Sequence, residues 1–179
     1  MIRRYLQDPL LESLKHFPAV LLTGARQVGK STLAQALIGA SWDAAYLTLD
    51  DRPILDAALR DPDGFVNGLP MPVVIDEVQK APDLLRAIKR AIDRNRKPGQ
   101  YLLTGSANIM TLATVSESLA GRIALHTLHP FCWPEFLEKP EPVILKDLFG
   151  GIDSKTLLKK YRSRSRAIIA LSLRCKTSQ

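Results

Sequence analysis

The stretch GARQVGKS, residues 24–31, decides the fold class of this 179-residue chain. It fits the pattern GxxxxGK[ST], follows an apolar run over residues 19–23, and precedes residues 31–38, which we predict to be a helix ending at Gly39. A glycine-rich turn between a strand and a helix aims backbone N–H groups inward, where the positive end of the helix also attracts anions. The stretch therefore predicts a phosphate-binding loop. The alternative is a glycine-rich turn that matches by chance.

The residues of this loop have distinct predicted roles. Lys30 is placed to reach the β- and γ-phosphates of a nucleotide, and Ser31 supplies a hydroxyl ligand for Mg²⁺, a cation that prefers oxygen ligands. The predicted nucleotide-binding residues are Gly24, Ala25, Arg26, Gln27, Val28, Gly29, Lys30, Ser31 and Thr32. The loop thus predicts a nucleoside triphosphate with Mg²⁺ as its ligand.

A second motif is VVIDE, residues 73–77, in which a β-favouring apolar run ends on two carboxylates. Such a strand carries its carboxylate to the sheet edge where the phosphate loop also opens, so we expect Asp76 to hold Mg²⁺ directly or through water. Glu77 is the candidate for orienting or deprotonating the attacking water. The alternative is a pair of solvated carboxylates at a strand end. Glu77 favours an ATPase over a small-molecule kinase, which remains the competing enzyme class.

Strands and helices alternate along the rest of the sequence. We expect a short N-terminal helix over residues 6–17 and a break at Asp61-Pro-Asp-Gly64. The expected strands cover residues 19–23, 45–49, 73–75, 101–104 and 123–128, and the other helices cover residues 31–38, 53–59, 82–96 and 109–119. This alternation predicts an α/β fold with a mostly parallel five-stranded sheet flanked by helices.

Two further residues are candidates for catalysis. Ser106 follows the fourth predicted strand, where a polar side chain could position water or sense the γ-phosphate; a helix cap is the alternative. Arg122 precedes the fifth predicted strand and could act as an arginine finger on the nucleotide of its own chain or of a neighbouring copy. Its alternative role is a surface ion pair.

Charge divides the chain into two parts. Residues 1–150 hold 17 basic and 17 acidic side chains, whereas residues 151–179 hold 8 basic side chains against Asp153 alone. Four prolines, at positions 130, 134, 140 and 142, mark the boundary. We therefore predict an ATPase domain over residues 1–137, followed by a proline-containing linker and basic tail over residues 138–179.

Composition narrows the location and the partners. The sequence has no apolar run of the length that crosses a membrane, no secretory signal, and no cysteine spacing typical of a disulfide framework or a zinc site. We expect a cytoplasmic protein without membrane contact. The basic tail could contact nucleic acid, although a solvated, disordered tail is the simpler interpretation.

Four segments in order, GARQVGKSTL, VVIDEVQKAPDLL, LLTGSAN and SLAGR, resemble the bacterial and archaeal AAA+-superfamily ATPases of the AAA_14 type. The resemblance spans about residues 3–136. It implies that ATP is the nucleotide and that the fourth strand lies between the first and the third. Lys30, Ser31 and the Asp76-Glu77 pair match functional positions of the family, and Ser106 and Arg122 match its motifs. The implied function is Mg²⁺-dependent ATP hydrolysis that drives a conformational change in a partner or a homo-oligomer.

The resemblance ends before the chain does. Members of the family usually continue into a C-terminal domain, whereas this sequence runs through Gly150-Gly151 into alternating arginine and serine residues. We expect residues 138–179 to be disordered or the remnant of a truncated or frameshifted chain. The alternative function is a nucleotide-binding module with little or no turnover, whose basic tail contacts nucleic acid.

Overall fold

The sheet at the centre of the fold has five strands, and all of its pairings are parallel. The strands are β1 (Ala19–Gly24), β2 (Ala45–Thr48), β3 (Val73–Asp76), β4 (Tyr101–Ser106) and β5 (Ile123–Leu128). Their spatial order is β2-β3-β4-β1-β5, which confirms both the predicted α/β fold and the position of the fourth strand between the first and the third. All five strands start at one edge of the sheet, the amino edge, and end at the other, the carboxyl edge.

The computed structural model describes residues 2–39, 42–106, 121–140, 155–156 and 159. The chain divides into two units, Met1–Glu138 and Lys139–Gln179, and the sheet belongs to the first. In the second unit, the described residues are 139–140, 155–156 and 159. Within these ranges, no helix combines the length and the apolar composition needed to cross a bilayer.

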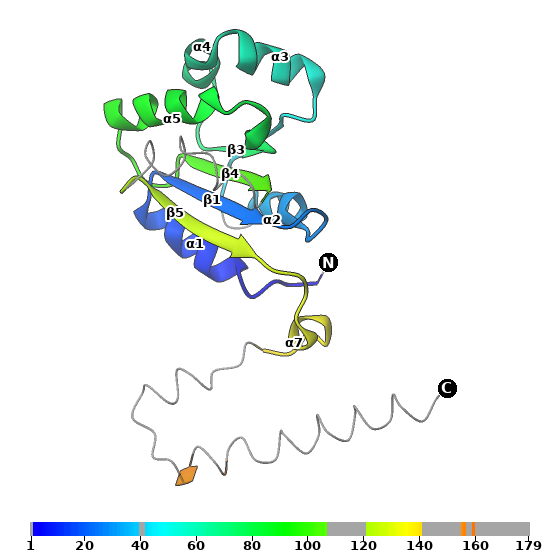
Figure 1. Ribbon diagram of the computed structural model, residues 1–179. Coiled ribbons are helices and arrows are strands. Elements are labelled where there is room, and N and C mark those ends of the chain that lie inside the picture. Colours follow the sequence, from blue (N-terminus) through cyan, green and yellow to red (C-terminus); the bar gives the residue numbers. More distant parts are fainter. Residues whose placement is uncertain (1, 40–41, 107–120, 141–154, 157–158, 160–179) are drawn as a thin grey trace. The chain divides into compact units, whose positions relative to one another are not determined.

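Helices cover both faces of the sheet (Figure 1). One face packs against α1 (Gln7–His16) and α2 (Lys30–Leu37), and the other packs against α3 (Arg52–Arg60), α4 (Pro62–Asn67) and α5 (Asp83–Arg94). Two short elements complete the described part of this unit, the 3₁₀ turn η1 (Val78–Lys80) and α7 (Trp133–Phe136). The phosphate loop lies between β1 and α2, as the sequence predicts.

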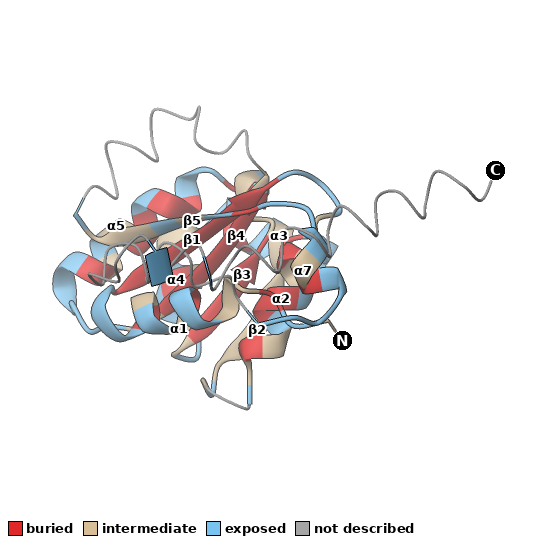
Figure 2. Cartoon of the chain, turned by 90° about the horizontal axis from the view of Figure 1, so that it is seen from below, coloured by how far each residue is buried: buried red, intermediate tan, exposed pale blue. Residues whose placement is uncertain are grey.

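The core explains why the strands are apolar along their whole length. In β1, Val20 and Leu22 face α1 and α2, while Ala19 and Leu21 face α5, and all four are fully buried. Figure 2 shows the strands as buried and the outer sides of the helices as exposed. Each fully buried leucine contributes about 1.5–3 kcal/mol. The sheet is therefore a firm platform for the loops at its carboxyl edge.

One expected break is instead the junction of two helices. The Asp61 carboxylate accepts a hydrogen bond of 2.9 Å from the Gly64 N–H and caps α4, whose first residue is Pro62. Proline suits the first turn of a helix because that N–H has no intrahelical partner. The sequence analysis took Asp-Pro-Asp-Gly for a turn and missed this helix. The helix predicted over residues 109–119 lies outside the described residues.

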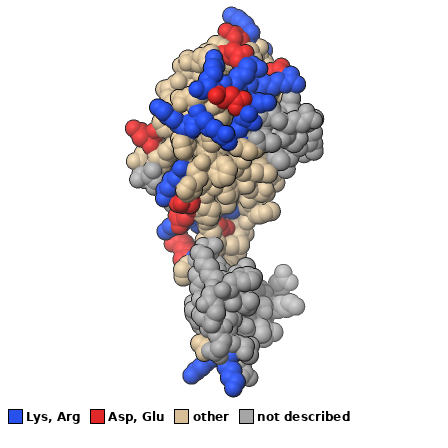
Figure 3. All heavy atoms as spheres, turned by 90° about the vertical axis from the view of Figure 1, so that its left-hand side faces the viewer, with Lys and Arg blue, Asp and Glu red and all other residues tan. Residues whose placement is uncertain are grey.

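The amino edge carries exposed charges. Figure 3 views the side of the unit from which the strands start, where Lys and Arg side chains gather with Asp and Glu among them. Arg90 on α5 pairs with Asp63 on α4 at 2.6 Å, and Arg122 pairs with Asp93 at 2.5 Å. The Arg90 and Asp63 side chains are each about half exposed. Ion pairs of this kind contribute little to stability.

Candidate nucleotide-binding site

The loop between β1 and α2 has the backbone shape of a phosphate cradle. Gly24 has a φ of +154°, and a Cβ at this position would lie 2.4 Å from the carbonyl oxygen of Leu128 on β5, so no other residue fits. Gly29, with a φ of +93°, precedes α2 in the left-handed region. Gln27 also has a positive φ, of 62°. These reversals let successive N–H groups turn toward one side of the loop.

Lys30 lies against this loop. Its side chain is 5% exposed, and its Nζ donates to the carbonyl oxygens of Gly24 at 3.3 Å and Ala25 at 2.9 Å. The ammonium group is therefore held within the turn that precedes α2. It adds a full positive charge to the partial positive charge of the helix N-terminus.

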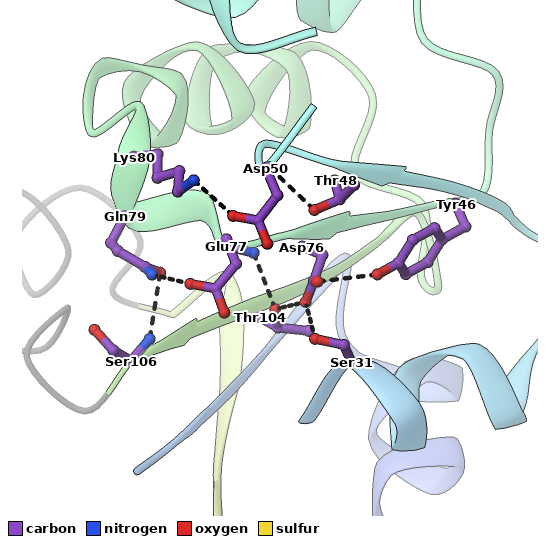
Figure 4. Close-up of polar contacts among 10 residues, drawn as sticks. All are labelled: Ser31, Tyr46, Thr48, Asp50, Asp76, Glu77, Gln79, Lys80, Thr104 and Ser106. Atoms are coloured by element: carbon purple, nitrogen blue, oxygen red, sulfur yellow. Dashed lines mark hydrogen bonds and ion pairs between the residues drawn. The ribbon is translucent and has the colours of Figure 1, made fainter. Parts of the chain in front are cut away.

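Asp76, the last residue of β3, accepts three hydroxyl hydrogen bonds (Figure 4). Ser31 Oγ donates to Oδ1 at 3.0 Å and Tyr46 OH donates to Oδ2 at 2.9 Å. Thr104 Oγ1 also donates to Oδ1. Asp76 is 3% exposed. The structure thus brings Ser31 of the loop and Asp76 together, although β4 separates their strands in the sheet.

The sequence analysis missed two of these three hydroxyl groups. Burial raises the pKa of Tyr46 to about 12, and the hydrogen bond to Asp76 acts in the same direction, so the phenol stays protonated and donates. Thr104 is fully buried and also accepts a hydrogen bond of 3.1 Å from the Glu77 N–H. Thr104 lies in the TGS stretch that drew attention to Ser106, whereas no pattern in the sequence points to Tyr46.

Glu77 directly follows β3, with a φ of 60° in the left-handed region. Gln79 on η1 donates from Nε2 to Glu77 Oε2 and accepts at Oε1 from the Ser106 N–H at 3.2 Å. Ser106 therefore reaches the site through its backbone and through Gln79, a residue that the sequence analysis did not select. Beside them, Lys80 pairs with Asp50 at 2.6 Å (Figure 4). The carboxylate of Glu77 is thus fixed in direction beside Asp76.

Arg122 lies at the other edge of the sheet. It directly precedes β5, whose first residue, Ile123, pairs with Ala19 at the start of β1. At about 3.3 Å per residue, a six-residue strand places its two ends roughly 17 Å apart. The structure does not bring Arg122 to the phosphate loop of the same chain.

The oxygen groups around Asp76 fit Mg²⁺. A serine hydroxyl and a carboxylate are hard oxygen donors, and Mg²⁺ takes one or two such protein ligands while phosphate and water supply the rest. Among the described residues, the His, Cys, Asp and Glu side chains form no group of three that could hold a metal ion by themselves. The donor set therefore suits a cation that arrives with a nucleotide.

The AAA domain family (AAA_14) matches residues 16–137, which include the loop, Asp76 and Glu77. The chain belongs to this family. An AAA domain is an ATPase domain of the P-loop type, so nucleotide binding is the function that this membership supports. The matched range also includes residues 107–120, which lie outside the described part of the chain.

Similar proteins were found by sequence and by structure. Two uncharacterized proteins, from Mycobacterium bovis and Mycobacterium tuberculosis, are each 40% identical over 124 residues, which is 69% of this chain and 27% of theirs. The Walker-type ATPase PabY2304 of Pyrococcus abyssi has a TM-score of 0.48 and 16% identity, covering 99% of this chain and 77% of that one. The match thus spans about a quarter of the length of the mycobacterial relatives.

Proposed function

We propose that this AAA domain binds Mg²⁺-ATP at residues 24–32 and hydrolyses it. The observation that supports this most strongly is the 3.0 Å contact between Ser31 and Asp76, with Glu77 next in the chain. It joins a hydroxyl of the phosphate loop, a buried carboxylate and a second carboxylate at one edge of the sheet. Open parallel sheets bind their ligands at that edge.

Binding is assigned to the loop and to Asp76. The loop N–H groups and Lys30 would surround the β- and γ-phosphates, and Ser31 and Asp76 would hold Mg²⁺, which neutralises phosphate charge when bound. Tyr46 and Thr104 keep the Asp76 carboxylate oriented by donating to its two oxygens. Such neighbouring hydrogen bonds preserve the geometry of metal ligands.

Hydrolysis is assigned to Glu77. Its carboxylate would accept a proton from a water molecule as the water oxygen bonds to the γ-phosphorus. The bond from the γ-phosphorus to the bridging oxygen then breaks, its electron pair leaves with ADP, and inorganic phosphate is formed. The contact from Gln79 to Glu77 limits the directions in which the carboxylate can point.

The test is calorimetry with Mg²⁺-ATP together with phosphate release on the same sample, for wild type, Lys30→Ala and Glu77→Gln. We expect Lys30→Ala to lose binding and Glu77→Gln to keep binding while turnover falls about 10²- to 10⁴-fold. Glu12→Gln is the matched control because Glu12 is exposed on α1. Wild-type protein that binds no ATP would refute the proposal, and binding without phosphate release would reduce it to a nucleotide-binding module.

We also propose that Arg122 acts on the nucleotide of a neighbouring copy, because it lies at the edge opposite its own loop. Leaving the exposed pair with Asp93 would cost little. Arg122→Ala and Lys30→Ala should each be inactive alone and regain turnover when mixed, because one supplies the loop and the other the arginine. Turnover per chain that does not depend on protein concentration, with no rescue on mixing, would contradict this role.

The second candidate function concerns the tail. Eight basic side chains against Asp153 alone over residues 151–179 would attract nucleic acid, and ATP turnover by the cytoplasmic protein would then change the conformation of a partner. Filter binding with and without residues 151–179, at low and high salt, tests this. Affinity that survives the deletion would assign nucleic-acid binding to residues 1–150 and exclude the tail.

A further inference from the structure

Arg4 is a buried arginine that the proposed mechanism does not use. It is 5% exposed and lies ahead of α1, far in sequence from the residues that surround it. A buried guanidinium has to place its donors on protein acceptors, because an unsatisfied buried charge is strongly destabilising. The partners of Arg4 therefore show what the fold gains from burying it.

Arg4 joins three separate segments. Its Nη1 donates to the Val28 carbonyl oxygen in the phosphate loop at 3.0 Å, and its Nη2 donates to the His129 carbonyl oxygen at 2.6 Å. Its Nε donates to the Glu135 carboxylate at 3.2 Å, and the guanidinium lies 4.2 Å from the centroid of the Phe131 ring. One side chain thus connects the loop to the residues that follow β5.

Glu135 ties the same residues from the other side. It is 6% exposed and accepts hydrogen bonds from the Tyr5 N–H at 2.8 Å and the Cys132 N–H at 3.1 Å. Burial raises its pKa, but those two N–H groups and Arg4 outweigh burial and hold the pKa below the ordinary value. The carboxylate is therefore charged at neutral pH and compensates Arg4.

The contact with Val28 matters because of where Val28 lies in the loop. Gln27 before it and Gly29 after it both have positive φ values. When the N–H groups of a loop turn toward a phosphate, its carbonyl groups turn the other way and need donors of their own if they are buried. Arg4 supplies that donor to Val28. It therefore stabilises the loop conformation in which N–H groups face the ligand.

We propose that Arg4 is a positioning residue of the phosphate loop, and that it couples nucleotide binding in the loop to the aromatic segment Phe131–Phe136. The coupling follows from geometry, since a shift of the Val28 carbonyl changes the acceptor of a side chain that also holds His129 and Glu135. Trp133, which is 58% exposed and stacks on Phe136 at 5.7 Å, lies in the segment that would respond. This inference rests on the proposed binding of ATP.

A lysine cannot replace this arginine. Arg4 uses three nitrogens in one plane for three acceptors, whereas a lysine ammonium has a single nitrogen and cannot reach all three sites at once. Arg4→Lys therefore keeps the positive charge beside Glu135 and removes the fixed geometry. Arg3→Lys is the matched control because Arg3 is exposed and pairs with Asp8.

The experiment uses the full chain with Trp42→Phe, which leaves Trp133 as its only tryptophan. Calorimetry gives the affinity for Mg²⁺-ATP, and Trp133 emission is followed to saturation. We expect the emission to change with ATP in this background and in Arg3→Lys. In Arg4→Lys we expect about tenfold weaker binding, and less than a third of the emission change at saturating ATP. A purely structural role would lower the unfolding temperature without moving the saturated emission change.

Three outcomes would overturn the inference in distinguishable ways. If Arg4→Lys binds ATP with wild-type affinity and gives the full Trp133 response, Arg4 has no positioning role. If the background protein binds ATP with no Trp133 response, the coupling is absent. If the background protein binds no ATP, the proposed function itself fails, and the Arg4 proposal fails with it.

Phe131→Leu provides a second variant if Arg4→Lys does not fold. It removes the half-exposed ring beside the guanidinium and keeps the three hydrogen bonds of Arg4. We expect wild-type ATP affinity with the Trp133 response reduced by at least half. An unchanged response would show that the loop and the aromatic segment are not coupled through Arg4.

Discussion

The two edges of the sheet hold charged groups in opposite ways. At the carboxyl edge, Lys30, Asp76 and the Arg4–Glu135 pair are all at most 7% exposed and are surrounded by hydrogen bonds. At the amino edge, the Arg90–Asp63 pair is about half exposed on both sides. In the described part of the chain, no buried side-chain nitrogen or oxygen lacks a partner.

This difference separates charges that serve a site from charges that serve the surface. Taking an ion out of water costs several kcal/mol even after relaxation, and ordinary folds avoid it. A fold that buries several charges at one edge, each with partners, holds them in fixed positions for a ligand. Exposed pairs at the other edge keep the surface solvated and contribute little to stability.

The largest effect on stability is expected from Glu135→Gln. The change leaves the Arg4 guanidinium buried without an opposite charge, which costs about 3–5 kcal/mol. Urea unfolding followed by circular dichroism measures the loss. A loss below about 1 kcal/mol would mean that water reaches Arg4, and that the carboxyl edge is no drier than the amino edge.

Acid sharpens the same comparison. Because the pKa of Glu135 lies below its ordinary value of 4.5, the folded protein resists its protonation more than the unfolded chain does. The contribution of Glu135 to stability is therefore complete above about pH 4.5 and is lost as the pH falls through the lowered pKa. The difference in unfolding free energy between wild type and Glu135→Gln should be constant near neutral pH and shrink in acid. A constant difference down to pH 3 would contradict the ionised buried pair.

Lys30→Ala is expected to weaken Mg²⁺-ATP binding by roughly 10- to 100-fold, because it removes a charged hydrogen-bond donor to phosphate. Lys97→Ala is the matched change at the amino edge, where the side chain is exposed, and it should leave affinity unchanged. Calorimetry at one salt concentration compares the two. Equal losses in both variants would show a general electrostatic attraction instead of a built site.

Thr104→Val is expected to destabilise the fold by about 1–3 kcal/mol, because it removes a donor to Asp76 and leaves the Glu77 N–H without its acceptor. Thr127→Val is the control of the same shape at an exposed position on β5. Urea unfolding midpoints measure both changes. A harmless Thr104→Val would mean that the Asp76 carboxylate is held without β4.

Asp63→Asn should have the smallest effect. The exposed Arg90 loses an ion pair but remains solvated, so the unfolding midpoint should match that of wild type within error. Thermal unfolding at low and at high salt checks this. A clear loss of stability that disappears with salt would show that the charges of the amino edge act together.

The sequence was sufficient for the fold because local patterns determine its elements. Apolar runs bounded by Pro18, Gly24 and Asp76 predict β1 and β3, and the structure confirms them with the α/β class. The exception is α4, whose cap at Asp61 uses the same residue types as a turn. The roles of Lys30 and Glu77 remain predictions that await measurement.

The supporting contacts of the site were not predictable in the same way. Arg4 and Glu135 are 131 positions apart, and Tyr46 reaches Asp76 from a neighbouring strand. No spacing or composition rule links such residues, since the sheet order alone brings them together. Arg122 was equally open, because only the register of β5 against β1 shows which edge it occupies.

The central place of β1 in the sheet also sets when the phosphate loop can form during protein synthesis. β1 pairs on one side with β4, which begins at Tyr101, and on the other with β5, which ends at Leu128. At roughly 5–20 residues per second, the ribosome completes that second partner roughly 5–20 s after Gly24. During this interval the apolar strand has neither neighbour, so a growing chain would gain affinity for ATP only after β5 emerges, and until then β1 is a segment for chaperones to shield.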